Sequence, residues 1–200
     1  MIEKRNKIEL KGKTLQEIEN IVEELGEKKF RAQQIYNWMY NHLKTDFSEM
    51  DNIPKKLREA LNDKYSLNSL SLVTTQQATK TSTKKYLFST FDSRNIESVI
   101  IPDGDRNTLC LSTQVGCPLD CKFCATGLMG YKRNLTPGEI VDQYFLTALD
   151  FGKTNITNIV YMGMGEPLLN FDSTVKSLQI FTSEQNTGLS RKRITVSTSG

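Results

Sequence analysis

Apolar side chains recur at helical spacing through residues 1–65. The spacing predicts one helix over residues 15–25, a second over residues 31–43 and a third that begins near Pro54, a suitable first helical residue. The first of these helices follows a capping box, Thr14-Leu15-Gln16-Glu17. We therefore expect the chain to begin with a small helical accessory domain.

The pattern changes near residue 66, where apolar residues begin to fall in short extended runs. Residues 86–88 and 98–101 are strand-like, and polar segments rich in turn-forming residues separate such runs. This pattern predicts a strand-rich connector over residues 66–107.

Strand and helix patterns alternate over residues 108–200. Strand-like runs lie at residues 109–113, 159–162 and 194–196, and a second capping box, Thr136-Pro137-Gly138-Glu139, opens a helix between the first two. Alternating strands and helices are typical of βαβ units on a parallel sheet. The fold class predicted for this part is therefore α/β.

Composition narrows the class of protein. Of the 200 residues, 38% are apolar and 24% charged, which excludes a fibrous, low-complexity or wholly disordered chain. The chain lacks the run of about 18 apolar residues that a membrane-spanning helix needs. Its first seven residues carry charges where a signal peptide would need apolar ones. We therefore expect a cytoplasmic protein without a membrane partner.

The net charge of +3 is too small to indicate nucleic-acid binding by itself. The basic residues do cluster, however, and such clusters could contact phosphates. The clusters are Lys80, Lys84 and Lys85; Lys132 and Arg133; and Arg191, Lys192 and Arg193.

All four cysteines lie within one short segment: Cys110, Cys117, Cys121 and Cys124. Thiols stay reduced in a cytoplasmic protein, so a framework of disulfides is disfavoured. Cysteines that serve only as small buried apolar residues would be scattered along the chain. Three cysteines spaced C-x3-C-x2-C on one loop instead favour a metal or cluster ligand set.

Thiolates suit iron–sulfur clusters, zinc or Cu(I). Structural zinc takes four protein ligands, and the only histidine, His42, is remote in sequence. Three ligands on a four-iron cluster would leave one iron open for a small molecule, as catalysis requires. Gly116, Pro118 and Gly127 would permit tight wrapping, and Phe123 could shield a cluster from water.

Three blocks of the sequence, taken together in their order along the chain, resemble the RlmN family within the radical S-adenosylmethionine (SAM) superfamily. The blocks are Val115-Gly116-Cys117-Pro118-Leu119-Asp120-Cys121-Lys122-Phe123-Cys124-Ala125-Thr126-Gly127, Gly163-Met164-Gly165-Glu166-Pro167-Leu168-Leu169-Asn170 and Ser197-Thr198-Ser199-Gly200. Members of that family methylate carbon 2 of an adenine in 23S ribosomal RNA and, in some cases, in a transfer RNA. The resemblance implies the same activity here, with the helical domain and the basic clusters as RNA contacts.

The resemblance also implies two cofactors, a [4Fe–4S] cluster and SAM. By the matching positions, Cys117, Cys121 and Cys124 hold the cluster, whose open iron binds SAM. Gly165 and Glu166, after the second strand, and Ser197, at the end of the third, contact SAM. Two SAM molecules are used per turnover, and an electron donor such as flavodoxin reduces the cluster.

Two further roles come from the resemblance. Cys110 would form a transient disulfide with a second cysteine near the C-terminus, which resolves a covalent RNA–protein intermediate. Glu97 would be the general base that accepts the proton from the methylated adenine carbon. From the residues alone, Cys110 would be a core strand residue and Glu97 a strand carboxylate that faces solvent.

Alternatives stay open at this point. A sister family methylates carbon 8 of the same adenine, although Pro167 and the Ser-Thr-Ser-Gly block favour carbon 2. A non-catalytic iron–sulfur or RNA-binding protein and a zinc module are further possibilities. Colourless protein that holds zinc would exclude the radical SAM interpretation.

Length adds one expectation. A βα unit takes about 30 residues, so the segment from Cys110 to Gly200 holds about three of them. The core that it resembles is a partial (β/α)6 barrel, so we expect the first half of that barrel, with the third strand as a bare edge. No cysteine follows Cys124. We therefore expect an N-terminal portion of a protein that is a monomer at full length.

Overall fold

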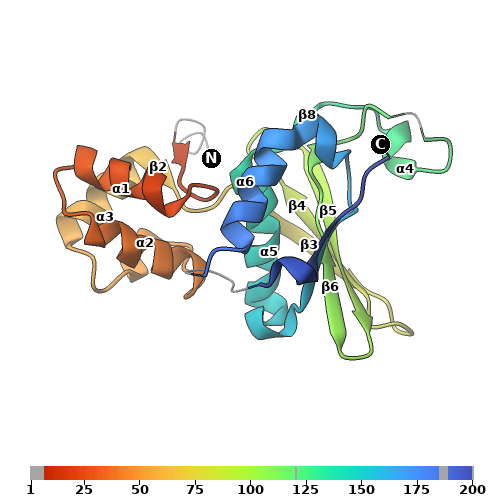
Figure 1. Ribbon diagram of the computed structural model, residues 1–200, viewed down its shortest axis with the longest axis horizontal. Coiled ribbons are helices and arrows are strands. Elements are labelled where there is room, and N and C mark those ends of the chain that lie inside the picture. Colours follow the sequence, from red (N-terminus) through yellow and green to blue (C-terminus); the bar gives the residue numbers. More distant parts are fainter. Residues whose placement is uncertain (1–6, 120, 185–188, 200) are drawn as a thin grey trace.

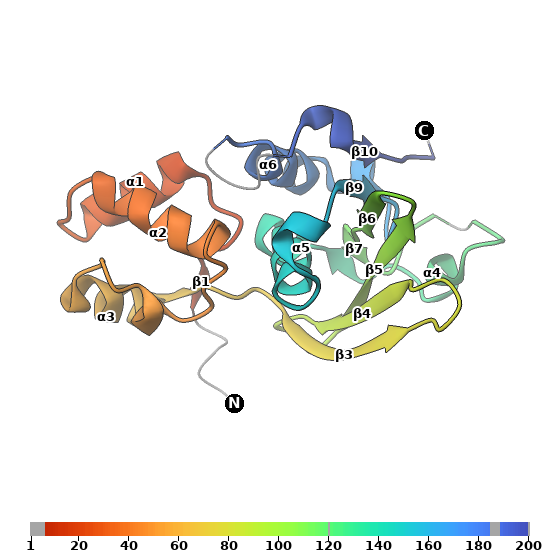
Figure 2. The same ribbon diagram turned by 90° about the horizontal axis from the view of Figure 1, so that it is seen from below.

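The computed structural model describes residues 7–119, 121–184 and 189–199. It has a helical unit at the N-terminal end and a six-stranded sheet with two long helices at the other (Figure 1). The helix α5 (Pro137–Phe151) lies between the helical unit and the sheet (Figure 2). Among the described residues, every helix is too short or too polar to span a lipid bilayer.

The helical unit contains α1 (Leu15–Glu24), α2 (Phe30–Tyr40), the short 3-10 helix η2 (Phe47–Glu49) and α3 (Lys55–Lys64). The predicted capping box is present, because the Thr14 hydroxyl accepts the N–H of Glu17 and the Glu17 carboxylate accepts the N–H of Thr14. Two short strands, β1 (Ile8–Glu9) and β2 (Tyr65–Ser66), pair in parallel and bring the two ends of the unit together.

The second helix ends at Tyr40, three residues before the end that the sequence predicts. Leu43, the last apolar residue of the predicted pattern, has a φ of 55° and so lies in the left-handed region. A helix cannot continue through such a residue, and the apolar side chain packs against the core from a loop instead.

The sheet has the strand order β10-β9-β6-β5-β4-β3. Its strands are β3 (Ser71–Gln77), β4 (Lys84–Ser89), β5 (Asn95–Asp103), β6 (Arg106–Cys110), β9 (Asn158–Tyr161) and β10 (Ile194–Val196). The strands β6, β9 and β10 are parallel, as predicted, and β3 to β6 form an antiparallel meander. The strands predicted as a connector therefore extend the sheet of the α/β part, which the sequence pattern did not indicate.

Two helices, α5 and α6 (Phe171–Phe181), cover one face of this sheet (Figure 2). Side chains alternate between the two faces of β5: Ile96, Ser98 and Ile100 are buried, and the Ser98 hydroxyl donates to Gln143 of α5 at 2.7 Å. Glu97 and Val99 therefore lie on the opposite face.

The remaining elements are short. They are β7 (Gln114–Val115), α4 (Ala125–Leu128), β8 (Arg133–Asn134), and the 3-10 helices η3 (Lys153–Asn155), η4 (Pro167–Asn170) and η5 (Arg191–Arg193). The first predicted strand, over residues 109–113, ends at Cys110 in the structure. Residues 111–113 continue as an extended segment, since the N–H groups of Leu111 and Thr113 donate to the carbonyls of Val160 and Met164.

The helical unit docks tightly against α5. An added Cβ on Gly12, whose φ is +83°, would lie 2.2 Å from the backbone nitrogen of Gly138. Beside this contact, the Lys11 ammonium faces the Asp142 carboxylate at 3.6 Å, with both side chains almost fully buried. A Cβ on either Gly12 or Gly138 would collide with the facing segment, so the backbones of the two segments are in direct contact only because both residues are glycine.

Candidate cofactor site

Three parallel strands end at one edge of the sheet, and each leads into a segment that the sequence singles out. The cysteine-bearing loop follows β6, Gly165 and Glu166 follow β9, and Ser197 follows β10. Parallel strands that are neighbours have their carboxyl ends at the same edge, where α/β folds bind ligands. The Ser197 N–H donates to the carbonyl of Tyr161 at 3.3 Å, and the Ser199 N–H donates to Glu166 Oε2 at 3.0 Å.

Glu166 is held as a carboxylate by backbone donors. Its Oε1 accepts the N–H of Leu168 and its Oε2 accepts that of Ser199, each at 3.0 Å. Burial acts to raise the pKa of Glu166, but these N–H donors outweigh it and keep the pKa below its usual value. The carboxylate is therefore positioned and charged at this edge.

Gly165 cannot carry a side chain in this arrangement. Its φ is +97°, and an added Cβ would lie 2.5 Å from Cβ of Gln114. Gln114 in turn accepts the backbone N–H of Glu166 on its Oε1 at 2.9 Å. Glycine at this position lets the segment after β9 pack directly on the stem of the cysteine-bearing loop.

The cysteine loop, defined here as residues 116–132, leaves and re-enters the fold at one place. Its two stems, residues 113–115 and 133–135, contain β7 and β8, which pair antiparallel. An added Cβ on Gly116, whose φ is +75°, would lie 1.8 Å from the carbonyl oxygen of Gly130. The tight wrapping predicted for Gly116 is therefore confirmed, and the loop is closed at its base.

The donor set of this loop fits an iron–sulfur cluster in its chemistry. Cys117, Cys121 and Cys124 are partly exposed and free of disulfides. The N–H of Gly127 lowers the pKa of the Cys124 thiol, which favours the thiolate that binds iron. In the described part of the chain, no three His, Cys, Asp or Glu side chains lie close enough together to bind a metal ion.

Phe123 lies between two of the predicted cluster ligands, and its side chain is 94% exposed. No apolar surface of the described fold covers it. Its role as a shield for a bound cluster stays a prediction.

Glu97 and Cys110 lie on the same face of the sheet, away from α5. Cys110 is directly opposite Val99 in the register of β5 and β6, and Glu97 is two residues along from Val99. Glu97 and Cys110 are thus diagonal neighbours, a spacing of about 7–8 Å between α-carbons. Cys110 is only 8% exposed, and burial raises the pKa of its thiol. It is separate in the fold from the cysteine loop.

The comparisons with known proteins agree with this geometry. Residues 8–67 match the family model for the ribosomal RNA large subunit methyltransferase N-terminal domain, and residues 111–200 match that of the radical SAM superfamily. The probable dual-specificity RNA methyltransferase RlmN of Aquifex aeolicus is 43% identical over 187 residues, which cover 94% of this chain and 53% of that protein. The dual-specificity RNA methyltransferase RlmN of Saccharophagus degradans is 44% identical over 200 residues, 97% of this chain and 50% of that protein.

This chain belongs to the RlmN family.

A solved structure supports the fold in the same way. The radical SAM methyltransferase from Sphaerobacter thermophilus superposes with a TM-score of 0.91 at 42% identity, over 96% of this chain and 57% of that one. The predicted fold class, part of a radical SAM barrel behind a helical domain, is confirmed. The chain spans about half the length of the curated RlmN relatives that it matches.

The basic clusters of this chain divide into two kinds. Arg133 is bound by its own protein: its guanidinium donates to both carboxylate oxygens of Glu139 at 2.7 and 2.8 Å and to Asp92 at 2.7 and 3.1 Å. Lys84 and Lys85 are paired with Asp150 and Glu97 at 2.5 and 3.0 Å. These three side chains therefore have partners within the protein, and their role as RNA contacts stays a prediction. Within the clusters, the exposed residues are Lys80, Lys132, Arg191, Lys192 and Arg193.

Sequence reasoning missed the buried amides that surround the site. Gln143 of α5 accepts the Ser98 hydroxyl and the Ser112 N–H on its Oε1, and its Nε2 donates to the Ser112 carbonyl at 2.9 Å. Asn170 donates to carbonyls on both stems of the cysteine loop. Asn170 is the last residue of the block Gly163–Asn170, which resembles the RlmN family, but the sequence does not show which distant residues a polar side chain contacts.

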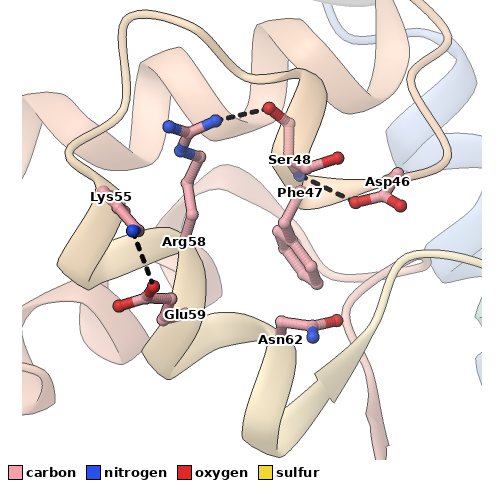
Figure 3. A pocket seen from close by; sticks show the side chains of 7 residues that line it. All are labelled: Asp46, Phe47, Ser48, Lys55, Arg58, Glu59 and Asn62. Atoms are coloured by element: carbon pink, nitrogen blue, oxygen red, sulfur yellow. Dashed lines mark hydrogen bonds and ion pairs between the residues drawn. The ribbon is translucent and has the colours of Figure 1, made fainter.

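A pocket of about 220 Å³ lies elsewhere, between η2 and α3 of the helical unit (Figure 3). Its charges are neutralised locally, because Lys55 pairs with Glu59 at 3.8 Å and Arg58 donates to the carbonyl of Ser48. The Asp46 carboxylate accepts the Ser48 N–H at 2.7 Å. None of the residues that line this pocket belongs to the candidate cofactor site.

Proposed function

We propose that this chain carries the cluster-binding and SAM-binding part of a radical SAM methyltransferase that methylates carbon 2 of an adenine in 23S ribosomal RNA, and also in a transfer RNA. The observation that carries the proposal is the meeting of three segments at one sheet edge: the cysteine loop after β6, Gly165-Glu166 after β9 and Ser197 after β10. The RlmN relatives named as dual-specificity RNA methyltransferases support the substrate class.

Each residue of that edge has a proposed task. Cys117, Cys121 and Cys124 would hold a [4Fe–4S] cluster, which when bound supplies the electron for reductive cleavage of SAM. The Glu166 carboxylate would accept hydrogen bonds from the ammonium group of SAM, and the Ser197 hydroxyl would provide a further polar contact. Gly165 would let the ligand approach the backbone closely, since no Cβ fits there.

Glu97 and Cys110 are proposed to act on the RNA from the neighbouring face. Glu97 would accept the proton from the methylated adenine carbon, and the Lys85 ammonium, 3.0 Å away, would orient its carboxylate. In the covalent RNA–protein intermediate, the Cys110 thiolate would attack the sulfur of the family's methyl-carrying cysteine. An S–S bond would form as the bond from that sulfur to the RNA carbon breaks, and the electron pair of the broken bond would pass to the RNA. That second cysteine is not among these 200 residues, since none follows Cys124.

The rest of the proposal follows the family. One SAM would methylate the second cysteine and another would supply the radical, so two are used per turnover, with an electron donor such as flavodoxin. An adenine carbon buried in folded RNA is inaccessible, so the base would be splayed into the site. We propose a cytoplasmic protein that acts as a monomer at full length.

Anaerobic reconstitution with iron and sulfide tests the cofactor part. We expect a brown protein that cleaves SAM when reduced with dithionite. Cys117→Ala, Cys121→Ala and Cys124→Ala should lose the iron, whereas Cys110→Ala, the matched control, should retain it. A colourless protein that binds zinc, or equal iron in all four variants, would contradict the proposal.

Charge reversal of exposed lysines tests the RNA part. Lys80→Glu and Lys132→Glu should weaken binding to ribosomal RNA and reduce its dependence on salt, because counterions released from phosphates drive such binding. Reversal of Lys84 would also break its ion pair with Asp150 and is therefore a less selective test. Binding that is unaffected by Lys80→Glu and Lys132→Glu would refute these contacts.

A further inference from the structure

The base of the cysteine loop is held by a side chain from a distant segment. Asn170, only 4% exposed, donates from Nδ2 to the carbonyl oxygen of Thr113 and to that of Leu135, each at 2.8 Å. Thr113 precedes the loop by three residues and Leu135 follows it by three. An asparagine amide has two N–H donors, so each stem of the loop receives one.

A second layer of amides lies beside the first. Gln114 of β7 donates from Nε2 to Oδ1 of Asn134 in β8 at 2.8 Å, and Asn134 donates to the carbonyl of Leu169 at 3.1 Å. The Glu166 N–H returns to Oε1 of Gln114 at 2.9 Å. The segment from Glu166 to Asn170 is therefore hydrogen-bonded to both stems of the cysteine loop.

We propose that Asn170 is a positioning residue: its amide clasps the two stems of the cysteine loop to the segment that carries Glu166. The clasp holds the two ends of the loop in a fixed position relative to Glu166. The benefit of this positioning for cluster binding rests on the proposed function, but the clasp itself can be measured in the protein without iron.

The alternative role for Asn170 is to cap α6, which begins at the next residue. Its side-chain oxygen accepts no capping hydrogen bond from α6, however, and its two N–H groups donate to the two stems. Aspartate is as good an N-cap as asparagine and equal in size. Asn170→Asp therefore removes the clasp selectively, because a carboxylate has no N–H to offer and would face two carbonyl oxygens.

Hydrogen exchange of single backbone amides tests the clasp. The reporters are Leu135, whose N–H donates to Thr113, and Lys132, whose N–H donates to Val115. Ser177→Ala is the matched control, since it removes a buried hydroxyl of the same helix that is 2.6 Å from the Tyr161 hydroxyl and makes no contact with the loop. Asn170→Asp should raise the exchange rate at Leu135 and Lys132 about tenfold or more, with little change at amides of β6 and β9. Ser177→Ala should not produce this local pattern.

Iron retention provides the second measurement. After reconstitution, Asn170→Asp should release iron to a chelator faster than Ser177→Ala does at equal global stability. Should Asn170→Asp fail to fold, Asn170→Ser, which keeps one hydroxyl donor, should show the same pattern at an intermediate size. Exchange at Leu135 and Lys132 that is unchanged, or that rises only in parallel with the core strands, would overturn the clasp. Wild-type protein that takes up no iron would refute the proposed function alone, because the exchange result still decides the clasp.

Discussion

The buried ion pair between Lys11 and Asp142 joins the helical unit to α5, and removal of either partner should cost much more than removal of both. The exposed fractions of the two side chains are 2% and 0%. Asp142 Oδ2 accepts the N–H groups of Ser69 and Leu70 at 2.9 Å each, and the Lys11 ammonium lies 5.1 Å from the centre of the Phe145 ring. Burial lowers the pKa of Lys11 and raises that of Asp142, and each partner opposes the shift of the other.

The loss of unfolding free energy in each variant depends on which charged group stays buried without its partner. Breaking a buried pair from one side costs about 3–5 kcal/mol, because a charge stays in a dry site. Lys11→Met leaves a carboxylate with two N–H donors, so we expect about 3 kcal/mol. Asp142→Asn leaves an ammonium with aromatic rings as its neighbours, so we expect about 4–5 kcal/mol. The double variant buries no charge and should lose less than the sum of the two by about 2 kcal/mol or more.

Urea unfolding of the wild type, both single variants and the double variant gives the coupling free energy directly. The same measurement at several pH values tests the direction in which the unfolding free energy of Lys11→Met changes with pH. In Lys11→Met the pKa of Asp142 loses the partner that lowers it, so the folded state binds a proton more readily than the unfolded one. The unfolding free energy of this variant should therefore rise, relative to wild type, as the pH falls from 7 towards 5. Losses that simply add, or a pH dependence of opposite sign, would refute the reasoning.

Three other predictions concern single sites. In urea unfolding, Gly12→Ala should lower the unfolding free energy by several kcal/mol more than the control Gly26→Ala. Both glycines have a positive φ near 80°, but only a Cβ on Gly12 would collide with backbone atoms. Similar losses in the two variants would contradict the close packing at Gly12. Asp92→Asn should cost about 1–2 kcal/mol of unfolding free energy at pH 7, because hydrogen bonds from Arg133 hold the pKa of Asp92 below its usual value. This loss should begin to shrink as the pH falls below the usual pKa of aspartate, and it should vanish only near the lowered pKa of the folded protein; a loss that stays constant in acid would contradict it. In the protein without iron, iodoacetamide should alkylate Cys110 last and Cys124 early, as peptide mass spectrometry would show, and equal rates for the two would refute the difference in burial.

The parts of the fold that were predictable depend on neighbours in sequence. The starts of α1 and α5 lie at the two capping boxes, because a hydroxyl and a carboxylate three residues apart satisfy each other's backbone donors locally. The three-residue error at the end of α2 has the opposite origin. Its periodic pattern continues to Leu43, but packing places that residue in a left-handed turn.

The sequence allowed the candidate ligand residues of the site to be predicted, but not the side chains that hold those residues in place. C-x3-C-x2-C is a local spacing, and Gly165 and Glu166 stand in a recognisable block. Arg133 looked like a free cation in the sequence but is bound by Glu139, six residues ahead, and by Asp92, on another hairpin. Asn170 looked like the end of a motif but spans two stems that lie 35 and 57 positions earlier in the chain.

The sequence by itself determined the helical start, the alternation of strands and helices, the cysteine set and the family resemblance, because periodicity, caps and motif spacing are short-range properties of a chain. Only the tertiary structure decided that β3 to β5 extend the parallel strands with an antiparallel meander, that Glu97 and Cys110 share a face, and that buried amides hold the base of the cysteine loop. Strand order and buried hydrogen bonds join residues that are far apart in sequence. Their pairing depends on which surfaces meet when the core excludes water, and a linear pattern does not record that choice.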